Sequence, residues 1–131
     1  MVIGWSSQPA IAQDAVGCFY CGKWSVLSRV FYEAATLSIE KNTITWPPCG
    51  PVPVSFSVIN ETETKADVYL APSAYCELHD EAVRLIRFEL REDVFAPNTF
   101  NPNQLSVSLF GTEGQYRANY SGTWGVYLRA R

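Results

Sequence analysis

Hydrophobic residues recur at every second position through most of this chain, and this spacing constrains the fold most strongly. Successive side chains of a strand point to opposite faces, so a period of two buries one face of a sheet. The residues involved are mainly β-branched or aromatic, the types that strands favour. The pattern predicts strands in the ranges 24–32, 37–40, 44–46, 54–58, 66–70, 86–90, 105–109, 116–120 and 124–128.

Turn-forming residues separate these ranges. Lys41-Asn42 suits a tight turn, Pro47-Pro48 ends a strand because proline cannot donate to the ladder, and the polar stretch 60–65 reads as a turn. We expect residues 71–82 to be irregular, with one helical turn near 80–83, and a β-bulge near Leu85. Residues 94–104 are expected to form a loop, and residues 105–128 a three-stranded meander.

About eight or nine short strands with short connections indicate an all-β domain. No helical pattern is long enough to cover a parallel sheet, so successive hairpins favour an antiparallel meander. A sheet of this size in one small domain tends to close, which removes its exposed edges. We therefore predict a single domain over residues 16–131, an antiparallel barrel of about eight strands, with a β-sandwich as the alternative.

Charge and hydropathy exclude several classes of partner. The 131 residues carry a formal net charge of −3, and lysine and arginine are scattered along the chain. A nucleic-acid-binding protein needs a basic face, so nucleic acid is not expected as a partner. No apolar run reaches the ~18 residues of a membrane-spanning helix.

The N-terminal residues differ from the rest. Residues 1–12 carry no charge and end in Ala10-Ile11-Ala12, and small residues at these positions suit cleavage after Ala12. Residues 1–15 are therefore interpreted as a signal-peptide remnant or a flexible terminus, and the protein as secreted or periplasmic.

Four cysteines support an exported protein: Cys18, Cys21, Cys49 and Cys76. An even count in an exported chain predicts two disulfides. We favour pairs that tie the N-terminal cysteines to Cys49 and Cys76, because long loops restrict the unfolded chain more. The alternatives are a zinc site that adds His79 and a Cys76–His79 catalytic dyad. Neither is favoured, so no metal, cofactor or enzymatic activity is expected.

Gly22-Lys23-Trp24 opens the first predicted strand, and Arg129 lies in the last one. This arrangement resembles the lipocalin-like (calycin-type) barrels, whose G-x-W tryptophan plugs the closed end of the barrel beneath a C-terminal arginine. The resemblance implies a structural cation–π contact between Trp24 and Arg129. It also implies a small-molecule cavity.

The function predicted first is non-enzymatic binding of a small apolar ligand inside the barrel. Aromatic side chains on the predicted strands would line the cavity, and a packed interior without a cavity is the competing interpretation. The predicted ligand-binding residues are Trp46, Phe56, Tyr69, Phe88, Tyr116 and Tyr120.

The alternative function is a protein-interaction module, such as an enzyme inhibitor or an immunity-type protein. It would act through the loops 47–53, 71–82 and 94–104, which disulfides would hold rigid. Phe95 and Phe100 are hard to bury in the last of these loops, so they would form a lid or a protein contact.

Overall fold

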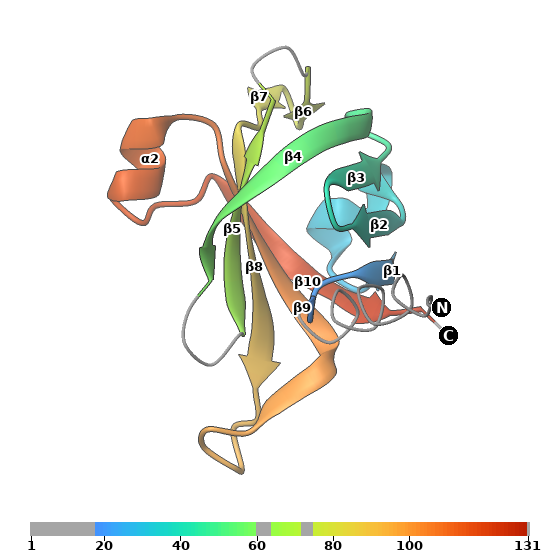
Figure 1. Ribbon diagram of the computed structural model, residues 1–131, viewed down its shortest axis with the longest axis vertical. Helices are drawn as coiled ribbons and strands as arrows, with labels where there is room; N and C mark the ends of the chain where they lie inside the picture. The colour runs from blue at the N-terminus through green and yellow to red at the C-terminus, as the bar shows by residue number, and fades with distance from the viewer. Residues whose placement is uncertain (1–17, 60–63, 72–74, 131) are drawn as a thin grey trace, which may run out of the picture.

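Eight antiparallel strands form a closed barrel (Figure 1). The computed structural model describes residues 18–59, 64–71 and 75–130. Around the barrel the strands follow the order β1-β10-β9-β8-β5-β4-β3-β2, and β6 and β7 form a separate two-stranded sheet. The elements are β1 (Gly22–Val26), η1 (Arg29–Ala34), β2 (Leu37–Glu40), β3 (Thr43–Trp46), β4 (Gly50–Ile59), β5 (Lys65–Leu70), β6 (Glu77–Leu78), β7 (Glu81–Ala82), β8 (Leu85–Glu92), β9 (Phe100–Phe110), α2 (Glu113–Arg117) and β10 (Thr123–Arg129).

The first and last strands close the barrel. β1 pairs with β10 so that Trp24 lies opposite Arg129, and β1 also pairs with β2. Every strand of the barrel therefore has two neighbours. The predicted all-β barrel of about eight strands is confirmed, and the structure is not the alternative sandwich.

The period-two pattern decides which side chains face inward. In β5, Ala66, Val68 and Leu70 are buried, and in β8 Ile86 and Phe88 are buried beside them. Aromatic rings also fill the interior: Tyr20 stacks on Phe88 at 5.9 Å, and Phe31 lies 5.1 Å from the Tyr127 ring. This apolar interior provides most of the driving force for folding.

The predicted strand over residues 24–32 is wrong in its second half. β1 ends at Val26, and residues 29–34 form the 3₁₀ helix η1. Phe31 and Ala34 are fully buried and lie three positions apart, which is the period of a 3₁₀ helix. The chain leaves the barrel wall here and folds across one end of the barrel.

The predicted strand over residues 116–120 is also wrong. Residues 113–117 form the short helix α2, so the expected three-stranded meander contains only β9 and β10. Thr112 Oγ1 accepts a hydrogen bond from the Gln115 amide, and Gln115 Oε1 accepts one from the Gly111 amide. These two bonds resemble a capping box, which starts a helix at this point.

The connections differ from the predictions in three more places. Residues 77–82 form the β6–β7 hairpin instead of a helical turn, with positive φ at both His79 and Asp80, as a type I′ turn requires. The register shift of β8 lies between Leu90 and Arg91, not near Leu85. The expected loop 94–104 is shorter, because β9 begins at Phe100.

Gly125 lets η1 approach β10, and its replacement gives a direct test of this packing. A Cβ atom at this position would lie 2.8 Å from a Phe31 ring carbon and 2.8 Å from Ser28 Cβ. We expect Gly125→Ala to lower the free energy of unfolding by about 1–3 kcal/mol through overpacking. Chemical denaturation measures the change.

Gly114→Ala in α2 is the matched control. The nearest atom to its added Cβ is Thr112 Oγ1 at 3.8 Å, so nothing has to move. Alanine also favours a helix over glycine by up to ~1 kcal/mol. Equal losses of stability in the two variants would contradict the close approach of η1 to β10.

Candidate functional site

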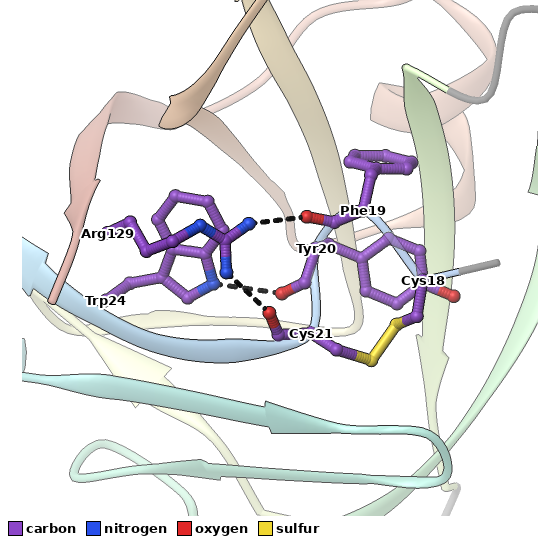
Figure 2. The surroundings of a disulfide bond; sticks show 6 residues. All are labelled: Cys18, Phe19, Tyr20, Cys21, Trp24 and Arg129. Atoms are coloured by element: carbon purple, nitrogen blue, oxygen red, sulfur yellow. Dashed lines mark hydrogen bonds between the residues drawn. A yellow bond between two sulfur atoms is a disulfide. The ribbon is translucent and has the colours of Figure 1, made fainter. Parts of the chain in front are cut away.

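One end of the barrel, here called the Trp24 end, is closed by a short turn before β1 (Figure 2). Arg129 reaches over this turn and donates from Nη1 to the Cys21 carbonyl and from Nη2 to the Phe19 carbonyl, both at 2.8 Å. Its guanidinium carbon also lies 4.2 Å from the Trp24 ring centroid, and Trp24 Nε1 donates to the Tyr20 carbonyl. The expected contact between Arg129 and Trp24 is thus present.

The four cysteines form the two expected disulfides, but with a different pairing. Cys18 pairs with Cys21 and Cys49 pairs with Cys76. The prediction that the N-terminal cysteines join Cys49 and Cys76 is therefore wrong, because the first pair closes its own turn. None of the four cysteines retains a free thiol. The Cys76–His79 dyad therefore lacks its nucleophile, and the candidate zinc site lacks its thiolates.

The opposite end, here called the η1 end, is covered by η1 and the β6–β7 hairpin. Phe31 of η1 contacts the rings of Trp46 and Tyr127, and Trp46 Nε1 donates to the Tyr127 hydroxyl at 2.9 Å. Burial raises the pKa of Tyr127 to about 12. His79 Nε2 lies 2.8 Å from the Val30 carbonyl oxygen, which links the hairpin to η1.

The structure does not bring the six predicted ligand-binding residues together. Trp46 and Phe88 are buried in the interior, whereas Tyr69 and Tyr116 make an edge-to-face ring contact outside the barrel. Tyr120 follows α2 and is 69% exposed. The backbone of Phe56 pairs with Val68, and its side chain lies outside the described part of the chain.

A buried ion pair lies on the outer face of β5 and β8, beneath α2. Arg87 donates from Nε to Asp67 Oδ1 at 2.8 Å and from Nη2 to Asp67 Oδ2 at 3.2 Å. The Tyr116 hydroxyl donates to the same carboxylate at 2.5 Å, and Arg87 Nη1 donates to Asn119 Oδ1. No side chain of α2 is buried. These bonds therefore anchor the α2 segment to the barrel.

Charge in this cluster shifts two pKa values. Burial acts to raise the pKa of Asp67, but hydrogen bonds from Arg87 and Tyr116 and the charges of Arg87 and Lys65 outweigh it, so the pKa lies below its ordinary value of 3.8. The bond to Asp67 raises the pKa of Tyr116 to about 12. Asp67 is therefore ionised and Tyr116 neutral at physiological pH, which is the state that holds α2.

An open apolar groove of about 500 Å³ runs over the β4–β5 pair. Tyr69 forms one wall, and its ring contact with Tyr116 connects this wall to the buried ion pair. Such a volume lies within the roughly 300–1,000 Å³ of typical binding pockets. The residues lining this groove, here called the β4–β5 groove, are Pro53, Val54, Ser55, Tyr69, Leu70 and Ala71.

The β8–β9 hairpin projects beyond the barrel at the Trp24 end (Figure 1). Its connection, residues 93–99, is called the hairpin tip below. At the tip, Val94 is 81% exposed and Phe95 is 94% exposed. A nearly fully exposed phenylalanine beside an exposed valine is the kind of apolar feature that marks a contact site.

The hairpin tip is held by its own hydrogen bonds. The Asp93 amide donates to the Thr99 carbonyl at 2.8 Å, and the Thr99 amide donates to the Ala96 carbonyl. Two carboxylates also accept backbone amides, Asp93 Oδ1 from Phe95 and Glu92 Oε2 from Asn98. The tip therefore presents Val94 and Phe95 in a defined conformation, which lowers the entropy lost when a partner binds.

No family model, curated protein or solved structure matches this chain. Within the described residues, no helix is both long and apolar enough to cross a bilayer. The β4–β5 groove and the hairpin tip are the surface features that bear on function.

Replacing Asp67 tests the anchoring of α2. The Asp67 side chain is 2% exposed, so Asp67→Ala would leave the Arg87 charge without its buried partner. We expect a loss of about 3 kcal/mol in the free energy of unfolding at neutral pH. The folded-state pKa of Asp67 is lowered, so the ionised carboxylate adds to the free energy of unfolding at any pH above the unfolded-state pKa. This stabilisation is lost as the pH falls through the folded-state pKa.

The difference in stability between the two proteins should therefore shrink as the pH falls through the lowered folded-state pKa of Asp67, because the wild type is then protonated in both states. Glu113→Gln is the control, since it breaks an exposed ion pair with Arg117 within α2 and should change stability by less than ~0.5 kcal/mol. A difference between wild type and Asp67→Ala that stays constant down to low pH would disprove the ionic contribution.

Proposed function

We propose that this chain is a non-enzymatic binding protein that engages a partner protein through the hairpin tip. The observation that carries the proposal is the 94% exposure of Phe95 on a tip whose own hydrogen bonds define its shape. A projecting tip of this kind fits a concave surface on the partner. Aromatic side chains that enter such pockets supply much of the energy of protein interfaces.

The rest of the chain supports this function as a rigid base. The closed barrel fixes β8 and β9, and the disulfide between Cys49 and Cys76 joins the β3–β4 turn to the segment before β6. Two disulfides favour an oxidising compartment, so the proposal includes a secreted or periplasmic protein. The Gly22-Lys23-Trp24 motif beneath Arg129 supports a lipocalin-like barrel as its ancestry.

Site-specific photo-crosslinking tests the proposed contact. A photoreactive phenylalanine analogue replaces Phe95 in one variant and Tyr120 in the control, both exposed aromatic residues. After irradiation in the compartment where the protein resides, position 95 should give a discrete adduct that mass spectrometry identifies. The absence of an adduct at position 95, or the same adducts from both positions, would rule out the tip as the contact.

Binding of a small apolar ligand in the barrel is the second candidate function. The buried hydrogen bond between Trp46 and Tyr127 favours it, because it places a polar pair in an aromatic interior directly under Phe31. Since these rings occupy the interior, a ligand would have to displace Phe31 and η1 from the barrel end. The His79–Val30 bond would then act as the latch of this lid.

Native mass spectrometry of the exported protein tests this second function. We expect an apolar adduct that organic extraction removes, and Trp46→Phe should reduce its occupancy because it deletes the donor to Tyr127. Trp124→Phe, at an exposed position, is the control and should retain the adduct. If the wild type carries no adduct and binds no apolar compound added to it, the second function fails.

A further inference from the structure

We infer that the partner of the hairpin tip is a second copy of this chain, and that each copy inserts its tip into the β4–β5 groove of the other. This inference rests on the proposed function and names its partner. The tip projects from the barrel and exposes the apolar side chains of Val94 and Phe95, and the groove is open and lined mainly by apolar residues. One chain therefore carries both halves of a complementary pair.

A tip cannot reach the groove of its own chain. Tyr69, in the groove wall, pairs with Leu85 at the start of β8, whereas the tip follows Glu92 at the other end of that strand. β8 has 8 residues, which at about 3.3 Å per residue separate the two features by about 26 Å. Contact between the tip and a groove of this kind therefore requires another molecule.

Charge adds a second kind of complementarity. Glu92 and Asp93 precede Val94, so the tip carries two carboxylates next to its apolar residues. At the end of the groove, Arg84 donates from Nη2 to the Ala71 carbonyl at 3.1 Å, which places a positive charge beside the groove. An ionised carboxylate accepts several hydrogen bonds, so the bonds within the tip leave capacity for an arginine.

Pairing of strand edges is a poor alternative mode of association. β10 reaches only as far as Gln104 in its register with β9, so residues 100–103 extend past it. Pro102 has no amide hydrogen, its carbonyl accepts from Arg129 Nε, and the Asn103 amide donates to Asn101 Oδ1. These groups are therefore not free to form a ladder with another strand. Association through the hairpin has to use side chains.

A reciprocal exchange of tips closes a twofold dimer. Each interface uses the same two surfaces on both copies, the self-complementary arrangement that most soluble dimers adopt. The two contacts form together, so the second one strengthens the first without loss of further translational freedom. A single tip-to-groove contact, in contrast, would leave one tip and one groove free.

Analytical ultracentrifugation of the purified chain tests the inference. We expect a concentration-dependent monomer–dimer equilibrium. Phe95→Ala removes the apolar side chain of the tip, and Ser55→Arg places a long charged side chain in the groove. Each should raise the dimer dissociation constant by about tenfold or more. Trp124→Ala and Ser25→Arg are the matched controls and should leave the dissociation constant unchanged, because both residues are exposed and lie on β10 and β1, which do not neighbour β4 or β5.

Mixing the two weakened variants tests the reciprocal geometry. A heterodimer of Phe95→Ala with Ser55→Arg keeps one intact tip facing one intact groove, so the mixture should associate more strongly than either variant alone. A monomer at all concentrations, a dimer indifferent to both substitutions, or no recovery on mixing would overturn the inference. If position 95 instead crosslinks to a different protein while the purified chain stays monomeric, self-pairing is wrong and the proposed function stands.

Discussion

Closure of the barrel between β1 and β10 is the constraint on which the rest of the structure depends. Arg129 stabilises this junction of β1 and β10 by three kinds of contact. Its backbone lies opposite Trp24 in the strand pairing, its guanidinium stacks on the Trp24 ring, and it donates hydrogen bonds to carbonyls of the turn before β1. A guanidinium presents several donors in a fixed plane, so one side chain can satisfy carbonyls from different residues. Because this junction is closed, neither strand leaves a free edge within the barrel.

Both ends of the closed barrel are covered, so a partner meets the outer surface of the protein first. Tyr20 enters from the Trp24 end and Phe31 from the η1 end, and both rings are buried. The outer surface carries the less common features, a buried ion pair under a helix without buried side chains, an apolar groove beside it, and an exposed phenylalanine. Buried charges and exposed apolar groups both cost free energy of folding. Features that lower stability in this way often serve a function.

The barrel itself was predictable from the sequence, because period-two burial is a local signal that tertiary contacts reinforce. The two incorrect strand predictions come from the same period-two pattern, which also occurs in segments that are not strands. Residues 24–32 and 116–120 also alternate, but Phe31 and Ala34 have the period of three of a 3₁₀ helix, and Thr112 with Gln115 forms a helix-start pattern. The disulfide pairing and the groove depend on which distant residues meet in space, and neither local pattern nor composition reports that. Asp67 and Arg87 likewise occupy outward positions where solvated charges are the ordinary expectation.

The groove, the helix and the ion pair form one unit, and this links stability to recognition. Asp67 binds Tyr116, Tyr116 contacts Tyr69, and Tyr69 forms a wall of the β4–β5 groove. The carboxylate therefore positions a groove wall that it does not touch. The hairpin tip uses carboxylates in the same way, since Asp93 and Glu92 shape the backbone that presents Phe95. In both places a charged side chain fixes the geometry of an apolar surface, so both surfaces are preformed before any partner arrives.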